Sequence, residues 1–405
     1  MWEQIRANQV RSVVLTAGMG MLLLLLGYFL GLLFFESSIG GLIIALIIWG
    51  IMSLVAYFQG DSILLAVSRA RKISRDDHPK LYNVVEEMKI ASGLEKMPDI
   101  YIIDDPALNA FATGRNSNKT AVAITSGLLA KLNRDELQGV IGHEIAHVKN
   151  RDVLLMAMCA VMLGTIVILA WYSTRILFFG SLAGGRRSSG SGGGQGQIII
   201  LIAGIGLMIL APIAAQFIYF AISRKREYLA DASSALYTRY PEGLASALEK
   251  LSASTVQLKS ANQATAPMYT VNPFRKEGKP ARNLTSTHPP ISERIRILRA
   301  MSGASMADYN QAYQQAEGKT GVVPASALAL DGLAGATALR APSPETKPVE
   351  ELPQKVERAR ETSDLMWRLG NYKTIACDCG TKLRVPPRFK ESTVRCPHCG
   401  RTNSV

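Results

Sequence analysis

The chain has 405 residues, is 48% hydrophobic and carries a formal net charge of +13, with a mean hydropathy of +0.13. Hydropathy this high favours a membrane protein, in which excess positive charge first indicates basic cytoplasmic flanks rather than a nucleic-acid surface. Four of the five cysteines lie in the last thirty residues, which excludes a disulfide framework spread over a secreted domain and indicates a metal site on the reducing side of a membrane.

Four apolar stretches, at about 13–35, 38–58, 153–174 and 198–222, are long enough to span a bilayer, which takes roughly 20 helical residues. The first is too long for a signal-peptide core and lacks a small-x-small cleavage site, so we expect an anchor. The link around "ESSIGG" between the first two carries no Lys or Arg, whereas basic residues flank the other ends: Arg6, Arg11, Arg69, Arg71, Lys72, Arg75, Arg224, Lys225 and Arg226. The positive-inside rule then places both termini and both large soluble segments in the cytoplasm, as in a multi-pass protein of a bacterial-type inner membrane.

Two points leave this topology open. The Gly/Ser-rich loop 180–197 would lie outside the cytoplasm although it carries Arg186 and Arg187. The third and fourth stretches could also form a buried helical hairpin in a soluble core, although no residue polar enough to mark a solvent face interrupts either one.

The segment between the second and third stretches predicts alternating helices and strands. A helix is predicted that ends at Gly93 and Pro98. Its five apolar residues recur at helical spacing: Leu81, Val84, Val85, Met88 and Ile90. "DIYIID" predicts a strand, "NAFATG" a short or edge strand, and "TAVAITSGLL" a strand entering a helix. Asn133 can cap the helix that follows.

Further along, residues 223–317 predict mostly helix with a loop near 262–287, and no internal repeat is present. Residues 318–360 are rich in Ala, Gly, Pro and Glu and predict a flexible linker. We therefore expect an α+β membrane protein with two N-terminal transmembrane helices in 1–60. A mostly helical zincin-type peptidase domain with a small sheet would fill 61–317, interrupted by a transmembrane hairpin at about 153–222. A zinc ribbon would fill 371–405.

The stretch "GVIGHEIAHVKNRD" carries the first chemical signal. His143 and His147 are four residues apart and lie on one helix face, so both imidazoles can reach one metal ion. Glu144 can contact a zinc-bound water without ligating the metal, and can take its proton as the water attacks a peptide carbonyl. The pattern H-E-x-x-H also occurs by chance, and two surface histidines are the alternative.

A catalytic zinc needs a third protein ligand. His288 is the only other imidazole available downstream, since His398 lies in the cysteine cluster. In "SRKREYLADASS", Glu227 and Asp231 are again four residues apart on a predicted helix, although Glu227 could simply pair with Arg224.

Four blocks carry a family resemblance. "HEIAHVKNRD", the hydrophobic hairpin after it and "REYLADASS" resemble the HtpX-type membrane zinc metallopeptidases, which are gluzincins related to the CAAX prenyl endopeptidases. "NAFATG" and "STHPPISERI" match two further blocks in the same order. The resemblance covers roughly residues 1–300 and is much more specific than H-E-x-x-H alone.

The resemblance implies zinc ligands and a base. His143, His147 and Glu227 would ligate a catalytic zinc, the metal that suits two histidines and one carboxylate best. Glu144 would be the general base and then the proton donor. The resemblance also implies cleavage of unfolded or damaged membrane proteins during stress.

Other matching residues would support the reaction. Asp231 would hold a ligand imidazole by a hydrogen bond. His288 would help stabilise the oxyanion, and Arg294 would orient Glu227 or the oxyanion. The alternatives are that His288 is a turn residue before Pro289 and that Arg294 is a surface charge. An edge strand, which can bind any extended chain through its backbone, would be formed by Asn109, Ala110, Phe111, Ala112, Thr113 and Gly114.

The cysteines at the C-terminus form a second constellation. Cys377 and Cys379 in "CDCG", with Cys396 and Cys399 in "CPHCG", can hold zinc with four thiolates, which leaves no open position and predicts a structural site. The module has few core residues and should not fold without its metal. His398 is a bystander in this interpretation. The first pair is C-x-C rather than the commoner C-x-x-C, and the simplest HtpX-type chains lack this ribbon.

Two other functions remain open. The chain could be a membrane-anchored adaptor with an inactive peptidase fold, whose ribbon binds protein or nucleic acid. The ribbon is basic, through Lys373, Lys382, Arg384, Arg388, Lys390, Arg395 and Arg401, but shows no aromatic stacking pair, so the sequence does not favour nucleic acid. A prenyl-protein peptidase is disfavoured because four spans would not enclose a chamber for such substrates.

Overall fold

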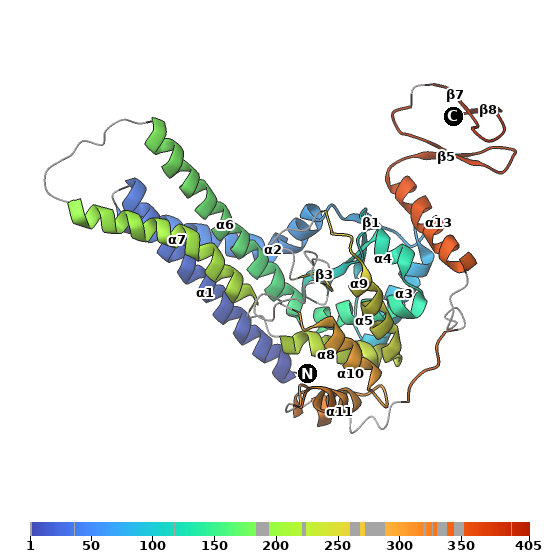
Figure 1. Cartoon of the computed structure of the whole chain (residues 1–405), viewed down its shortest axis with the longest axis horizontal. Coiled ribbons are helices and arrows are strands. Elements are labelled where there is room, and N and C mark those ends of the chain that lie inside the picture. The colour runs from blue at the N-terminus through green and yellow to red at the C-terminus, as the bar shows by residue number, and fades with distance from the viewer. Residues whose placement is uncertain are drawn as a thin grey trace.

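The computed structural model describes residues 2–35, 37–116, 118–183, 194–220, 224–259, 268–271, 288–318, 321–325, 327–329, 338–343, 352–389 and 391–405. A bundle of long helices extends from one side of a mixed α/β domain, and the C-terminal strands lie at the opposite end of the molecule (Figure 1). The predicted loops 180–197 and 262–287 fall largely outside the described residues.

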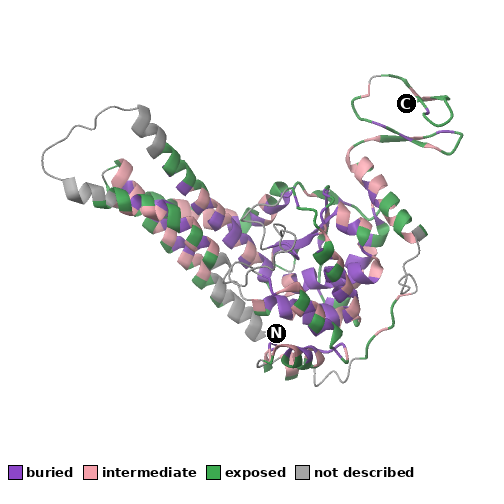
Figure 2. Cartoon of the chain, viewed as in Figure 1, coloured by how far each residue is buried: buried purple, intermediate pink, exposed green. Residues whose placement is uncertain are grey.

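The bundle contains α1 (Trp2–Phe35), α2 (Ser38–Val67), α6 (Asp152–Ala183) and α7 (Gly194–Phe220). Three stretches are long and apolar enough to span a membrane: Val13–Phe35, Ser38–Val67 and Asp152–Ile176. The fourth predicted span falls on α7, whose described residues include the shorter apolar stretch Leu201–Phe217. Large apolar side chains are exposed along these helices (Figure 2), as a lipid-facing surface requires.

A four-stranded sheet forms the centre of the globular domain. Its strands are β1 (Arg71–Ile73), β2 (Asp99–Ile103), β3 (Ala110–Asn116) and β4 (Lys119–Thr125), in the spatial order β1-β2-β4-β3. β2 and β4 run parallel, and the other pairs are antiparallel. The strands predicted from "DIYIID" and "TAVAITSGLL" are confirmed, and the "NAFATG" segment forms the edge strand β3.

Helices cover the sheet and complete the core. They are α3 (Pro79–Ser92), α4 (Ser126–Lys131), α5 (Arg134–Lys149), α8 (Arg224–Thr238), α9 (Pro241–Ala253), α10 (Ile291–Arg299) and α11 (Met306–Glu317). In α3 the apolar residues at 81, 84, 85 and 88 are buried as predicted, but Ile90 is 67% exposed. Ile90 lies two residues past Met88 and so turns off the buried face.

The C-terminal part consists of α13 (Leu352–Leu369) and two hairpins, β5–β6 (Lys373–Ala376, Lys382–Val385) and β7–β8 (Thr393–Arg395, Thr402–Ser404). α13 begins inside the range 318–360 that was predicted as a flexible linker, and much of the rest of that range lies outside the described residues. Leu365 of α13 is fully buried in the domain core, which stabilises the helical turn around it. Because the first turn is the costly step of helix formation, the helix can then extend toward its N-terminus.

Candidate metal centres

The first centre is built on α5. Asn133 caps this helix as predicted and forms a capping box with Glu136. One turn separates His143 from His147, and their Nε2 atoms lie 3.2 Å apart. Both imidazoles therefore point to the same small volume.

α8 brings Glu227 to these histidines. Its Oε2 lies 3.6 Å from Nε2 of His143, and its Oε1 lies 3.5 Å from Nε2 of His147. The helices can approach this closely because α5 has glycine at position 142, where a Cβ would lie 3.1 Å from the hydroxyl of Ser234. That hydroxyl donates a 2.6 Å hydrogen bond to the carbonyl of Gly139 and ties α8 to α5.

The three side chains fit a zinc ion. Tetrahedral zinc with bonds of about 2.0–2.1 Å holds its ligand atoms about 3.3 Å apart. Here the two Nε2 atoms are 3.2 Å apart, and each lies 3.5 or 3.6 Å from a different oxygen of Glu227. Burial disfavours the charged imidazole of His143, but hydrogen bonds to Asp231 and Glu227 outweigh it and raise its pKa to about 9. These two carboxylates favour a positive charge at this position, which a divalent cation would also supply.

Each histidine has a carboxylate at its other ring nitrogen. Nδ1 of His143 lies 2.9 Å from Oδ1 of Asp231, which the sequence indicated. Nδ1 of His147 lies 3.1 Å from Oδ2 of Asp152, which the sequence analysis did not select. A left-handed turn at Arg151 (φ +58°) separates Asp152 from α5. Its place at the end of "HEIAHVKNRD" is the one signal that could have identified it.

Arg294 of α10 is fully buried behind the histidines. Its Nε and Nη2 donate hydrogen bonds of 2.8 and 2.7 Å to the two carboxylate oxygens of Asp231, and its Nη1 lies 3.8 Å from Oε2 of Glu227. Burial would raise the pKa of Asp231, but the charges of Arg294 and His143 lower it, so Asp231 stays ionised. Arg294 therefore stabilises the acidic residue that contacts His143.

His288 also lies at this centre. Its Nε2 is 3.6 Å from Oε2 of Glu227 and the side chain is buried. Burial lowers the pKa of His288 to about 4, so the ring is neutral near pH 7. The structure thus brings all three histidines, Glu227 and Arg294 together.

A small cavity opens beside these ligands. It has a volume of about 20 Å³ and is lined by Ala112, Glu144, Arg226 and the segment Met268–Thr270, among others. This is room for about one water molecule. Glu144 is buried, and its Oε1 accepts a 2.7 Å hydrogen bond from the hydroxyl of Thr270.

Two further residues lie at this site, Arg226 and Thr270, for which the sequence patterns predicted no role. Arg226 is 5% exposed, and its Nη1 lies 3.7 Å from Oδ1 of Asp152. Of the predicted strand segment, Ala112 lines the cavity, and Asn109 contacts the chain after Thr270 through a 2.8 Å bond from Nδ2 to the carbonyl of Val271.

The second centre contains the four C-terminal cysteines. The Sγ atoms of Cys377 and Cys399 are 3.5 Å apart, and those of Cys379 and Cys396 are 3.7 Å apart. Zinc–sulfur bonds of about 2.3 Å in a tetrahedron give separations of about 3.8 Å, so the four thiols fit zinc. Glycines at 380 and 400 have φ of +83° and +74°, which lets each knuckle turn.

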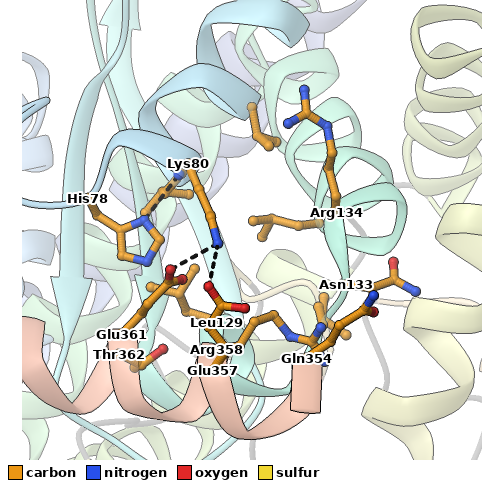
Figure 3. A pocket seen from close by; sticks show the side chains of 14 residues that line it. His78, Lys80, Leu129, Asn133, Arg134, Gln354, Glu357, Arg358, Glu361 and Thr362 are labelled. Carbon is orange, nitrogen blue, oxygen red and sulfur yellow. Dashed lines mark hydrogen bonds and ion pairs between the residues drawn. The ribbon is translucent and has the colours of Figure 1, made fainter. Parts of the chain in front are cut away.

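Another cavity, of about 350 Å³, is drawn in Figure 3, and none of its lining residues belongs to either centre. It is enclosed by α3, the start of α5 and α13, and Lys80 crosses it to Glu361 at 2.9 Å and Glu357 at 3.7 Å. Its polar lining mixes both charges, and neither of the two candidate metal-ligand groups found among the described residues lies in it.

Known proteins resemble this chain over most of its length. The model of Peptidase family M48 matches residues 75–302. "Protease HtpX homolog" of Streptococcus mutans serotype c is 42% identical over 298 residues, covering 74% of this chain and 99% of the relative. The protein of the same name from Streptococcus pneumoniae (strain Taiwan19F-14) is 43% identical over 301 residues, covering 74% and 100%.

Among solved structures, the crystal structure of S. mikatae Ste24p aligns with 74% of this chain and 67% of its own, with 22% identity and a TM-score of 0.38. The family match spans the "HEIAH" helix and the segment that carries Glu227. The chain therefore belongs to peptidase family M48, as an HtpX-type membrane metalloendopeptidase.

Proposed function

We propose that this membrane zinc protease hydrolyses peptide bonds of unfolded or damaged proteins, membrane proteins among them, as a quality-control enzyme. The observation that carries the proposal is the meeting of His143, His147 and Glu227 at zinc-ligand separations, with Glu144 lining the same cavity. An inactive peptidase fold would not need to keep both the three zinc ligands and the base Glu144. Their joint presence disfavours the adaptor alternative.

Each residue is proposed to have one role. His143, His147 and Glu227 would hold the catalytic zinc, which would act as a Lewis acid and lower the pKa of a water molecule. Glu144 takes the proton from that water as it attacks the peptide carbonyl, and then gives it to the leaving amine. His288, neutral near pH 7, donates a hydrogen bond to the oxyanion of the tetrahedral intermediate. Asp231, supported by Arg294, fixes the ring of His143.

The substrate is proposed to bind as an extended strand along β3. An edge strand offers backbone groups that pair with any unfolded chain, with little regard to its side chains. The ligands support a site at the bilayer surface, because His143 and His147 precede α6 and Glu227 follows α7. We further propose that all four long helices cross an inner membrane, that the site faces the cytoplasm and that the cysteines hold a second, structural zinc.

The test compares the purified, zinc-saturated wild type with Glu144→Gln in detergent, using an unfolded protein as substrate. Fragments from the wild type alone, with about two zinc ions per chain in both proteins, are the expected result. Equal cleavage by Glu144→Gln would remove Glu144 from the mechanism. Full zinc content without cleavage of either soluble or membrane-embedded substrates would favour the adaptor alternative.

A further inference from the structure

The segment Met268–Val271 lies beside the first residue of the edge strand. The main-chain N–H of Thr270 donates a 2.9 Å hydrogen bond to the carbonyl of Ala110. The hydroxyl of the same residue lies 2.7 Å from Oε1 of Glu144 and 3.0 Å from the carbonyl of Ala110. Thr270 is 2% exposed, so bulk solvent does not compete with these two acceptors for its hydroxyl proton.

The competition favours the carboxylate. A hydroxyl has one proton to donate, and an ionised acceptor binds it more strongly than a neutral carbonyl. The carbonyl of Ala110 already accepts the main-chain N–H of Thr270. The hydroxyl proton is therefore directed to Oε1 of Glu144.

The surroundings hold this hydroxyl in place. The side chain of Asn109 donates to the carbonyl of Val271 at 2.8 Å and accepts its N–H at 3.3 Å. Tyr269 packs edge-on against Phe111, with ring centroids 5.2 Å apart, and its hydroxyl lies 3.2 Å from that of Ser68. These contacts anchor Val271 to the residue just before β3, and Tyr269 to β3 and to the C-cap residue of α2.

The same framework reaches the metal ligands. Nη1 of Arg294 lies 3.4 Å from the carbonyl of Thr270, while Arg294 also binds Asp231, which contacts His143. One buried guanidinium thus connects the segment that contacts the base with the residue that contacts a zinc ligand.

We propose that Thr270 is a positioning residue for Glu144. Its hydroxyl occupies Oε1 and fixes the plane of the carboxylate, which leaves Oε2 as the oxygen that receives the proton from water. This inference rests on the proposed role of Glu144 as base. Because Thr270 acts on the base, its loss should slow turnover and leave substrate affinity and zinc content unchanged.

The test uses full-length, zinc-loaded protein and an unfolded peptide substrate, with kcat, KM, zinc content and thermal unfolding measured for each variant. Thr270→Val removes the hydroxyl at nearly equal volume and should lower kcat by about 10- to 100-fold at unchanged KM. Thr270→Ser keeps the hydroxyl and should restore kcat to near the wild-type value. Thr120→Val, a buried threonine on β4, is the matched control and should keep wild-type kcat.

The outcomes separate this inference from the proposed function. If Thr270→Val keeps or raises kcat while Glu144→Gln is inactive, the positioning role is overturned and the base role stands. If Thr270→Val and Thr270→Ala both lose zinc or fail to fold, Thr270 is a structural residue and the proposal is also overturned. Turnover by Glu144→Gln would instead contradict the proposed function.

Discussion

At the scale of single residues, the two ligand histidines are held by different carboxylates. Asp231 reaches His143 from α8, and Asp152 reaches His147 from the first residue of α6. Such contacts set the tautomer and the ring orientation of a metal-bound imidazole. The proposed zinc site would therefore depend on two residues, Asp231 and Asp152, that are not among its proposed ligands.

The first prediction concerns Asp152. Asp152→Asn should weaken zinc binding at the catalytic site by about 10- to 100-fold, because the amide cannot replace the charge that orients His147. Zinc competition with a chelator measures the change. Asp104, on an exposed loop, provides the control as Asp104→Asn, and equal affinities for the two variants would exclude the orienting role.

The second prediction concerns pH. In the metal-free site the pKa of His143 is raised to about 9, so its imidazole carries a proton at neutral pH. Zinc must displace that proton, and apparent affinity should therefore rise about tenfold per pH unit up to about pH 9 and level off above it. Titration in weak buffer should show proton release on zinc addition near pH 7. No release would contradict the assignment of His143 as a zinc ligand that is protonated in the metal-free site.

At the scale of elements, α13 joins the cysteine module to the domain. Leu365 is fully buried in the core of the domain, whereas the ion pairs of Lys80 with Glu357 and Glu361 of α13 lie at the surface. Next to the ion pairs, Arg368 and Arg71 make hydrogen bonds across the same contact. Buried apolar surface should dominate, since exposed ion pairs contribute about 0–1 kcal/mol.

The third prediction follows from that contrast. Leu365→Ala should cost about 2–5 kcal/mol of docking stability and expose α13 to protease, since it removes buried methyl groups. Lys80→Ala should change the cleavage rate little. Limited proteolysis with detection of the C-terminal fragment compares the two variants. Equal protection in both would mean that Leu365 does not hold α13 in place.

At the scale of the whole molecule, the domain and the helix bundle are not separate parts. The end of α2 and the start of α6 carry buried residues that pack with the sheet, including Leu64 and Leu155. In the most apolar stretch of α6, 50% of the residues are buried, against 17% in the corresponding stretch of α2. α6 therefore packs against protein more extensively than α2, and its first residue, Asp152, contacts His147 of the candidate zinc site.

The fourth prediction concerns orientation. A reporter fused after Val405 should report a cytoplasmic C-terminus, because basic residues flank the ends of the helices that join the domain. A reporter placed in the loop between α6 and α7 should report the opposite side. The same side for both would indicate that α6 and α7 do not cross the membrane.

Much of the architecture could be predicted from local patterns. The α5 cap at Asn133, the strands around "DIYIID" and three of the four predicted spans depend on neighbouring residues and are found in the structure. α13 was not predicted, since its burial depends on contact between Leu365 and the distant domain core. The roles of Asp152 and Thr270 were not predicted for the same reason. Asp152 meets His147 through a turn, and Thr270 meets Glu144 because its segment packs against β3.

The sequence by itself determined that His143 and His147 share a helix face with Glu144 between them, because helical geometry follows from spacing alone. It also determined the apolar runs and the paired cysteines. Only the tertiary structure decided which carboxylate serves each histidine and which hydroxyl contacts Glu144. Those contacts join segments far apart along the chain, and their distances depend on how the helices pack, for which residue spacing carries no information.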